Sequence, residues 1–346
     1  LNSPTSYLTQ EYLQEKYALT QTSDNILINA SVFPGKELVN EIIRLQNGQM
    51  LVSEKIIIAY KSEKANIPKE ITNPVESKVK ITKINFPWDI FTLNGKAIVD
   101  DFAILTKNKK SQEISSSNSC LAKENIFTEE GSKLEFVTLN ASGGPIYIGK
   151  NAEIMENSVI RGPFVLGEGA VIKMGAKIYG PTTIGPYSKI GGECNNVVVF
   201  GNSNKAHDGF LGNAVLGEWC NLGADTNNSN LKNNYAEVKV WNYPAQKFIP
   251  TGLQFCGLIM GDHSKCGINT MFNTGTVVGV CANIFGAGFP RNYIPSFSWG
   301  GPLGMAEYKL ETAFEVAERV FQRRGKEFTE TDKKILQYIF EETRNN

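Results

Sequence analysis

The chain of 346 residues is 41% hydrophobic and contains 32 glycines, a composition typical of folded proteins that are rich in turns. Its length suits two or three domains. Lysine and arginine together equal aspartate and glutamate at 35 each, so no net charge attracts the chain to nucleic acid or to anionic lipid. The sequence has no apolar run long enough to span a bilayer, and residues 1–16 do not resemble a signal peptide. We therefore expect a cytoplasmic protein with neither a nucleic-acid nor a membrane partner.

The cysteines and histidines argue against a metal centre. Six cysteines occur without a CxxC pair or a regular disulfide spacing, and only two histidines are present. Cys194, Cys220 and Cys266 occupy positions of a repeat, described below, that require a small or apolar side chain. We predict reduced packing cysteines and no metal ligands among the cysteines and histidines.

Residues 1–143 alternate between helical and strand patterns. We predict a short helix over Ser6–Tyr17, a strand at Ile26–Ile28, a helix opened by Pro34 and Gly35, and a strand at Met50–Tyr60. Strands that alternate with helices favour an α/β domain over residues 1–143. Because the chain opens on Leu1 rather than on methionine, we expect further residues upstream.

An aliphatic residue recurs at every sixth position in the middle of the chain. The members are Ile148, Ile154, Ile160, Leu166, Ile172, Ile178, Ile184 and Ile190. A small residue follows four positions after each of them, with Phe164 as the one bulky exception, and glycine follows at every third hexad. A hexad indicates short strands joined by tight turns, and the glycine period indicates three faces per coil. We predict a triangular parallel β-helix over residues 144–296.

The repeat is interrupted twice. It resumes at Phe210, Leu216 and Leu222 and again from Met260 to Ile284. The two stretches without it are Asn195–Gly209 and Asn227–Gly257. Insertions leave a solenoid as loops on one side, where they can form a site that regular coils cannot. We predict that both stretches are such loops and that they carry the chemistry.

The last part of the chain, residues 297–346, is helical in pattern. Ala306–Arg323 is amphipathic, and Thr329 with Asp332 resembles a capping box for a final helix. We predict two helices that pack against the end of the solenoid or against a neighbouring subunit.

One histidine lies in the first predicted loop. His207 follows Asn204, Lys205 and Ala206 in a stretch rich in glycine and asparagine. A histidine with an ordinary pKa of about 6.5 can accept a proton at neutral pH. The spacing alone leaves two interpretations open, a general base and a surface histidine without a function.

The residues around His207 form a series of short motifs. They are Lys205-Ala206-His207, Phe210-Leu211-Gly212-Asn213-Ala214, Asn221-Leu222-Gly223-Ala224-Asp225-Thr226 and Ser229-Asn230-Leu231. In this order and spacing they resemble the left-handed β-helix acyltransferases. The resemblance is strongest to the acetyltransferase half of the bifunctional N-acetylglucosamine-1-phosphate uridyltransferase / glucosamine-1-phosphate acetyltransferase family. It implies a transferase that uses acetyl-CoA.

The resemblance also implies roles for individual residues. His207 falls on the family's catalytic histidine and would deprotonate the acceptor amine or hydroxyl, while a backbone amide stabilises the oxyanion. Glu193 matches a glutamate near the acceptor. Asn221 and Asn230 match asparagines of the sugar site, and Ala224 matches a backbone position that contacts acetyl-CoA.

Three substitutions depart from the family pattern. Asn195 stands in place of a lysine that contacts phosphate, while Phe210 and Leu231 stand in place of two tyrosines. The loss of one cation and two hydroxyls changes the donors offered to a sugar phosphate, which leaves the acceptor open. Lys205 could supply a replacement charge and Arg291 could meet a CoA phosphate, although solvated lysines and solenoid-closing arginines are also ordinary.

The first segment carries a second resemblance. Trp88-Asp89-Ile90-Phe91 and Asp100-Asp101-Phe102 are similar to the back half of bacterial sugar nucleotidyltransferase domains. Those enzymes need a glycine-rich loop for the nucleoside triphosphate and acidic ligands for Mg²⁺. The chain has no such loop, so either the loop lies upstream or the domain is degenerate, and Mg²⁺ is expected only if the domain is active. As neighbours on a strand, Asp100 and Asp101 would face opposite ways, which favours a solvated pair over metal ligands.

These observations support one preferred function and two alternatives. The preferred function is acetyl transfer from acetyl-CoA to a sugar phosphate or a nucleotide sugar, in a homotrimer whose His207 loop faces a neighbouring subunit. The first alternative is nucleotidyl transfer from a nucleoside triphosphate to a sugar 1-phosphate, with the β-helix as an oligomerisation scaffold. The second is a non-catalytic assembly protein that binds a nucleotide sugar.

Overall fold

The computed structural model describes residues 4–344. The chain divides into two compact units, one formed by the residues up to Phe86 with Thr329–Tyr338, and the other by Pro87–Phe328 with the residues from Ile339 onward. The first unit holds a small α/β sheet, and the second holds a parallel β-solenoid followed by helices. The predicted fold class is confirmed in these three parts.

A four-stranded sheet in the order β1-β3-β2-β4 forms the first unit. Its elements are β1 (Asn25–Ile28), α1 (Lys36–Ile43), β2 (Met50–Ser53), β3 (Ile56–Ser62) and β4 (Pro74–Glu76). Leu38 and Ile42 of α1 are buried in one cluster with Leu51 and Ile58 of the sheet. This cluster is the core of the first unit.

Two sequence predictions for the first unit are wrong. The strand predicted over Met50–Tyr60 is a hairpin, because Glu54 and Lys55 adopt positive φ and reverse the chain between β2 and β3. The helix predicted over Ser6–Tyr17 is only a 3-10 turn at Glu11–Leu13. No side chain caps that turn, and the Tyr12 ring instead stacks on Tyr338 with their centroids 4.1 Å apart.

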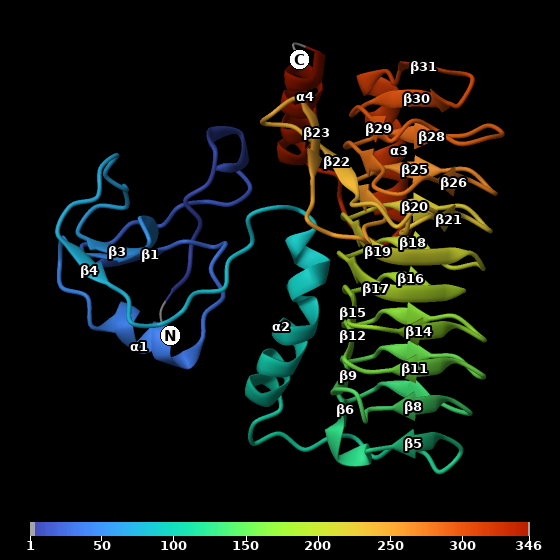
Figure 1. The fold of residues 1–346 in the computed structure, drawn as a ribbon, viewed down its shortest axis with the longest axis horizontal. Coiled ribbons are helices and arrows are strands. Elements are labelled where there is room, and N and C mark those ends of the chain that lie inside the picture. Colours follow the sequence, from blue (N-terminus) through green and yellow to red (C-terminus); the bar gives the residue numbers. More distant parts are fainter. Residues whose placement is uncertain (1–3, 345–346) are drawn as a thin grey trace. The chain divides into compact units, whose positions relative to one another are not determined.

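Each coil of the solenoid contributes strands to three faces (Figure 1). The first face contains β7 (Lys133–Leu134), β10 (Glu153–Ile154), β13 (Val171–Ile172), β16 (Lys189–Ile190), β18 (Asn204–Lys205), β20 (Asn221–Leu222), β25 (Lys265–Cys266), β28 (Asn283–Ile284) and β30 (Ser298–Gly301). The second face contains β5 (Ser119–Leu121), β8 (Thr138–Asn140), β11 (Val159–Arg161), β14 (Lys177–Tyr179), the first halves of β17 (Glu193–Val199) and β19 (Phe210–Leu216), and then β21 (Asn227–Asn228) and β26 (Met271–Phe272). The third face contains β6 (Ile126–Thr128), β9 (Ile146–Ile148), β12 (Phe164–Leu166), β15 (Thr182–Ile184), the second halves of β17 and β19, β24 (Ile259–Met260), β27 (Val277–Val278) and β29 (Tyr293–Ile294).

The predicted hexads form the interior of the solenoid. Ile154 pairs with Ile172 and Ile172 with Ile190, so a regular coil takes three hexads, as predicted. All the aliphatic residues of the run are at most 1% exposed. Burial of one such side chain contributes roughly 1.5–3 kcal/mol, so the column as a whole is a main source of stability.

The solenoid begins at Ser119, before the predicted boundary at residue 144. Ser119 pairs with Thr138 and Ile126 with Ile146, so this first coil is longer than three hexads. It also holds a 3-10 helix at Lys123–Asn125. A coil of irregular length has no hexad, and for this reason the sequence period does not detect it.

The first interruption of the hexad is a shortened coil, so the predicted loop over Asn195–Gly209 is wrong. Lys177 pairs with Glu193 and Lys189 with Asn204, and both spacings are shorter than three hexads. The whole stretch stays in the stack, within β17, β18 and the turns beside them. β17 pairs with strands of both the second and the third face, so it crosses the corner between them without a break.

The second interruption is an insertion, as predicted. Asn221 pairs with Lys265, a spacing of more than two regular coils, and a bridge between Leu231 and Phe255 closes the inserted segment. The segment contains a hairpin of two strands, β22 (Lys239–Asn242) and β23 (Lys247–Pro250). At the start of the predicted range, β21 pairs with β26 and remains in the stack.

One helix and the inserted hairpin cover the third face. Helix α2 (Asp89–Leu105) runs along the stack beside β15, β17 and β19 (Figure 1). Its Phe91 is 1% exposed and lies in one buried cluster with Val198 of the face and Val238 of the inserted segment. Thr183 of β15 also donates a 2.8 Å hydrogen bond to Asn94 of the helix. The helix therefore belongs to the solenoid unit, although it falls within the domain predicted over residues 1–143.

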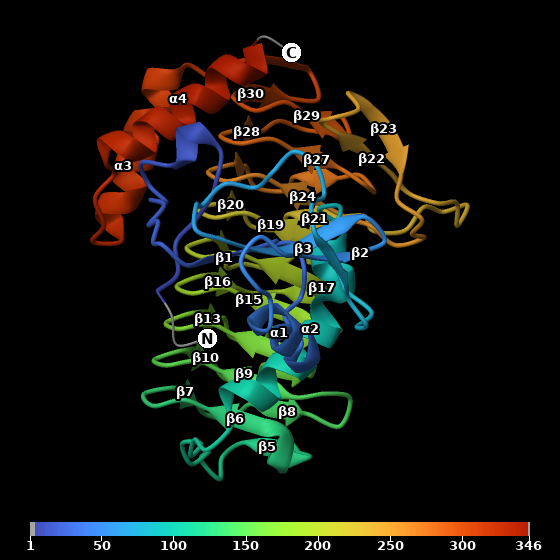
Figure 2. The same ribbon diagram turned by 90° about the vertical axis from the view of Figure 1, so that its left-hand side faces the viewer.

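Two C-terminal helices follow the last coil, as predicted. Helix α3 (Leu310–Arg323) lies alongside the upper coils, on the side away from β22 and β23 (Figure 2). Its Phe321 stacks on Trp219 with ring centroids 4.0 Å apart. The predicted helix start at Ala306 is wrong, because β31 (Gly304–Glu307) pairs with β30 instead.

The predicted capping box at the start of α4 (Glu330–Arg344) is present. The backbone N–H of Asp332 donates to Thr329 Oγ1 at 3.2 Å, and the N–H of Thr329 donates to the Asp332 carboxylate at 3.0 Å. No helix within residues 4–344 is long and apolar enough to cross a membrane.

We expect the contact of α2 with the third face to be a major contribution to stability. Phe91→Ala should lower the free energy of unfolding by about 3–5 kcal/mol, because it removes a fully buried aromatic ring. Ile104→Ala on the same helix is the matched control, because Ile104 is 67% exposed, and should change stability by less than about 0.5 kcal/mol. Urea denaturation of both variants measures the difference. Equal effects would mean that α2 does not stabilise the solenoid.

Candidate functional site

His207 lies at a corner between the first and second faces of the solenoid. This corner comprises residues 206–209, between β18 and β19. The side chain of His207 is exposed. No residue in the described part of the chain hydrogen-bonds to its imidazole. The ring is therefore accessible for proton transfer.

The corner of His207 rests directly on the corner of the coil below. That lower corner consists of Gly191 and Gly192 alone. A Cβ atom on Gly191 would lie 2.4 Å from the carbonyl oxygen of Ala206, and one on Gly192 would lie 2.7 Å from that of Gly209. Only glycine permits so close an approach. The turn that carries His207 is thus supported from below by backbone.

Lys205 reaches the same turn from inside the solenoid. Its side chain is 1% exposed. The ammonium group donates to the carbonyl oxygens of Gly191, His207 and Asp208 at 3.2, 2.9 and 3.2 Å. Burial lowers the pKa of Lys205. The expectation that Lys205 offers a charge to the substrate is therefore wrong, because its ammonium group lies in the interior and already contacts three carbonyls.

Glu193 presents a carboxylate on the second face, beside this corner. The Tyr179 hydroxyl donates to Glu193 at 2.6 Å, and Lys177 Nζ lies 3.7 Å from the same carboxylate. The hydrogen bond from Tyr179 to Glu193, together with burial, raises the pKa of Tyr179 to about 12. The hydroxyl and the ammonium group of the coil below therefore fix the orientation of the carboxylate.

Asn195, Phe210 and Asn230 lie on the same face as Glu193. β17 and β19 pair Glu193 with Phe210 and Asn195 with Gly212, so these residues stand about 5 Å apart on neighbouring strands. A Cβ atom on Gly212 would lie 2.4 Å from the Phe210 ring and 2.8 Å from Asn230 Nδ2. The absence of a side chain at Gly212 thus lets Phe210 and Asn230 lie together over β19.

Asn221 and Ala224 belong to the coil above His207. The corner that contains Ala224 lies on the corner of His207, because the N–H of Asp225 donates to the Asp208 carbonyl at 3.0 Å. Asn221 lies on the first face, where it accepts a 2.8 Å hydrogen bond from Asn204. The structure therefore brings Ala224 to the predicted site and places Asn221 around the corner from the second face.

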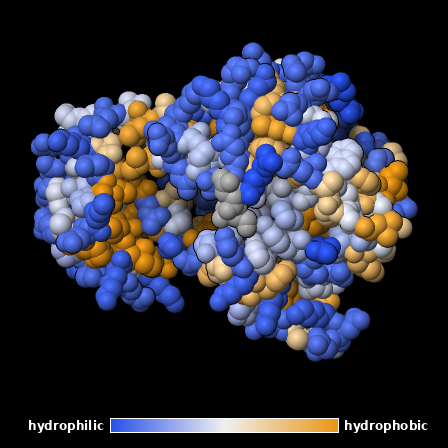
Figure 3. All heavy atoms as spheres, turned by 90° about the horizontal axis from the view of Figure 1, so that it is seen from above, coloured by the Kyte–Doolittle hydropathy of each residue, from blue (hydrophilic) through white to orange (hydrophobic). Residues whose placement is uncertain are grey.

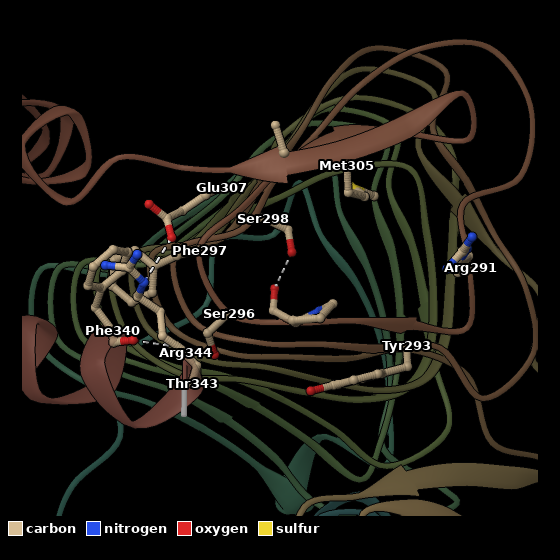
Figure 4. A pocket seen from close by; sticks show the side chains of 12 residues that line it. Arg291, Tyr293, Ser296, Phe297, Ser298, Met305, Glu307, Phe340, Thr343 and Arg344 are labelled. Atoms are coloured by element: carbon tan, nitrogen blue, oxygen red, sulfur yellow. Dashed lines mark hydrogen bonds and ion pairs between the residues drawn. The ribbon is translucent and has the colours of Figure 1, made fainter. Parts of the chain in front are cut away.

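Arg291 lies apart from His207, near the end of the solenoid. It follows β28, three coils beyond β18 in the first face, a rise of about 14 Å at the usual strand spacing. It lines a pocket of about 400 Å³ with Tyr293 and Arg344, and the two arginines lie on opposite sides of it (Figure 4). Arg344 pairs with Glu307 at 3.1 Å.

The aspartates of the first-segment motif lie on a helix. Asp100 and Asp101 belong to α2, so the prediction of a strand at these positions is wrong. Asp100 forms an ion pair with Lys96. Partial burial, together with the negative charge of Asp100, raises the pKa of Asp101. Residues 4–344 contain no group of three or more histidine, cysteine, aspartate or glutamate side chains placed to hold a metal ion.

Sequence reasoning missed Tyr179 and Lys177. They occupy β14, one coil below Glu193, and no motif marks them. The strand pairing leads back from Glu193 to Lys177 and from Asn195 to Tyr179. That spacing is shorter than the regular three hexads, so the shortened coil conceals both residues from a search by period.

Comparison with known proteins supports both halves of the predicted resemblance. Residues 1–110 match a family of sugar nucleotidyl transferases. The bifunctional protein GlmU of Methanocaldococcus jannaschii is 27% identical over 289 residues, which cover 77% of this chain and 57% of the relative. That of Methanococcus maripaludis is 25% identical over 288 residues, which cover 74% and 59%. The predicted resemblance to bifunctional transferases is confirmed, and the chain spans less than two thirds of the length of these relatives.

Solved structures with similar coils include two acyltransferases. The UDP-N-acetylglucosamine acyltransferase of Francisella novicida matches with a TM-score of 0.38 and 13% identity, covering 66% of this chain and 87% of that one. The Arabidopsis enzyme matches with a TM-score of 0.26 and 16% identity, covering 63% and 78%. The solenoid is established by its own strand pairing.

The contact between Glu193 and Tyr179 can be tested by titration. Glu193→Gln removes the charge that disfavours the tyrosinate, so the pKa of Tyr179 should fall from about 12 toward its ordinary value of about 10. NMR of ring-labelled tyrosine, with Tyr179→Phe to assign the signal, follows the change. Glu168→Gln is the matched control, because Glu168 accepts a hydrogen bond from Tyr187 in the same way. An unchanged Tyr179 titration in Glu193→Gln would contradict the contact.

Proposed function

We propose that the solenoid transfers an acetyl group from acetyl-CoA to a sugar phosphate or a nucleotide sugar, with His207 as the general base. The position of His207 carries this proposal: an exposed imidazole on a backbone-supported turn, beside a face that presents a carboxylate and amides. The motifs around His207 and the similarity to the bifunctional relatives point to the same reaction.

The reaction requires one proton acceptor beside the nucleophile. His207 takes the proton from the acceptor amine or hydroxyl, while the nitrogen or oxygen of the acceptor attacks the thioester carbonyl. The C–S bond then breaks, and the proton passes from His207 to the departing thiolate. Glu193 accepts a hydrogen bond from the acceptor and holds it in line for the attack.

The second face offers groups that suit a sugar. Asn195 and Asn230 carry amides that can donate to and accept from hydroxyls. Phe210 offers a ring against which the apolar side of a sugar can pack. Asn221 lies on the first face, across the corner from Glu193, and contributes to the site only if the acceptor extends over that corner. The absence of a cation at position 195 favours recognition of the sugar hydroxyls over strong recognition of a phosphate.

Acetyl-CoA would lie along the stacked corners. Ala224 stands directly over the turn of His207. In the proposed arrangement its backbone contacts the thioester. Arg291 lies further along the solenoid and offers a guanidinium group to a phosphate of CoA. The long pantetheine chain of CoA would connect the thioester beside Ala224 with a phosphate near Arg291.

We also propose that this corner faces another subunit in a homotrimer. Corners stacked with that of His207 carry four hydrophobic side chains that are 42–70% exposed: Phe136, Met174, Ile268 and Phe285. Seen from its upper end, the solenoid carries hydrophobic groups at its surface (Figure 3). Within the second unit, α2 and the hairpin cover the third face and α3 covers another corner, whereas no described element of that unit covers this corner.

A second candidate function rests on the first 110 residues. Their match to the sugar nucleotidyl transferases favours transfer of a nucleotidyl group from a nucleoside triphosphate to a sugar 1-phosphate, with Mg²⁺ as the metal. In that case the solenoid serves as a scaffold. A protein that binds a nucleotide sugar without turnover is the third candidate.

Thiol release from acetyl-CoA tests the proposal across a panel of amino sugars, sugar 1-phosphates and nucleotide sugars. His207→Ala should lower kcat by about 10²–10⁴ with the preferred acceptor. Its fold should be retained because the side chain is exposed. His263→Phe is the matched control, since Phe preserves an aromatic ring beside Trp219 and Phe321, and its activity should remain.

The other outcomes separate the candidates. Equal rates in wild type and His207→Ala would remove His207 as the base. Pyrophosphate release from a nucleoside triphosphate and a sugar 1-phosphate, without thiol release, would favour nucleotidyl transfer. Binding of a nucleotide sugar without either product would favour the third candidate.

A further inference from the structure

Lys205 occupies an interior position where the other coils carry apolar side chains. It pairs with Ile190 of the coil below. The inward residues of this face are Leu134, Ile154, Ile172, Ile190, Lys205, Leu222, Cys266 and Ile284. A charged group in such a column is costly unless hydrogen bonds replace its hydration. Its presence at this one coil therefore calls for a local reason.

The reason lies in the backbone of the adjacent corner. In the corners 173–176 and 223–226, the N–H of the fourth residue donates to the carbonyl of the first at 3.3 Å. Among the described residues, no such bond closes the corner 206–209. Its fourth residue is Gly209, with φ +111, where the equivalent positions carry Ala176 and Thr226. The corners 155–158 and 267–270 also lack this bond, but they carry a small buried side chain at the fourth position, Ser158 and Thr270. The turn of His207 lacks both the bond and that inward side chain.

The Lys205 ammonium supplies what this turn lacks. It binds the carbonyl oxygens of His207 and Asp208 in the turn and that of Gly191 in the coil below. One buried group thus ties the turn both to its own coil and to its neighbour. Each of its three protons has an acceptor, so a longer or uncharged side chain cannot reproduce the arrangement.

We infer that Lys205 is a positioning residue that holds the His207 turn, and with it the imidazole, in the orientation required for proton transfer. The inference rests on the proposed role of His207, yet its structural part can be measured without any activity. The Lys205 side chain is buried and is therefore out of reach of a bound acceptor or acetyl-CoA.

The chain offers a matched control in Lys265. It belongs to the same face, two coils above, and its ammonium donates to the carbonyl of His263 at 2.8 Å. His263 lies at a different corner, beside Trp219 and Phe321. A lysine change at either position removes a contact with a histidine turn, but only Lys205 contacts the turn of the proposed base.

The experiment compares Lys205→Met and Lys265→Met in the full chain. With only two histidines, the imidazole signals in NMR can be assigned with His263→Phe. In Lys205→Met the His207 signal should shift and broaden while the His263 signal stays, and Lys265→Met should show the reverse. If Lys205→Met does not fold, Lys205→Gln, which keeps one donor group, takes its place. A His207 signal unchanged in a folded Lys205 variant would overturn the inference.

Kinetics then connect the position of His207 to its use. Lys205→Met should lower kcat for acetyl transfer by about 10–100-fold and change KM by less than about threefold, because misplacement of the base affects the transition state more than binding. The pH dependence of kcat should lose the limb that reports His207. Lys265→Met should retain both. Full kcat in Lys205→Met despite a shifted His207 signal would overturn the catalytic part of the inference. A shifted signal in a protein that transfers no acetyl group would reject the proposed function and leave the positioning contact intact.

Discussion

The stacking of side chains inside the solenoid constrains the rest of the structure. Each coil must set its inward residues above those of the coil below, as Ile154, Ile172 and Ile190 do, because a coil out of register would turn its polar side chains into the interior. A coil of unusual length can satisfy this requirement only by changing its corners. The first coil lengthens the corner that holds Lys123–Asn125, and the coil below His207 shortens its corner to Gly191 and Gly192.

The candidate site follows from this constraint. In the coil below His207, the corner between the first and second faces consists of Gly191 and Gly192 alone. The turn that carries His207 therefore packs directly on their backbone. The same irregularity leaves carbonyl oxygens directed inward, and Lys205 satisfies them from the column. A departure from the repeat therefore produces an exposed imidazole and a buried cation together, and the buried cation would be costly in a regular coil that offers it no free carbonyl oxygens.

The three faces of the solenoid have different environments. The third face is covered by α2 and the inserted hairpin, which bury aromatic and β-branched side chains against it. Helix α3 covers the corner that carries Trp219. The second face keeps polar groups at its surface around Glu193, and the corner beside it carries exposed hydrophobic residues. The third face is covered, and the polar groups around Glu193 lie on the second face. For this reason a repeat with equivalent strands presents a single candidate site.

The amino-acid sequence by itself determined the three-sided parallel coil, the inserted segment before Gly257 and the helices at the end, because inward periodicity and capping are local properties of the chain. It also drew attention to His207 and Glu193 through their motifs. Only the tertiary structure decided that Asn195–Gly209 is a shortened coil, since a missing hexad looks the same whether the chain leaves the stack or cuts a corner. It likewise decided that Lys205 points inward and that Tyr179 holds Glu193. Both depend on which residues of neighbouring coils lie in register, and register is set by pairing across the stack rather than by the order of residues along the chain.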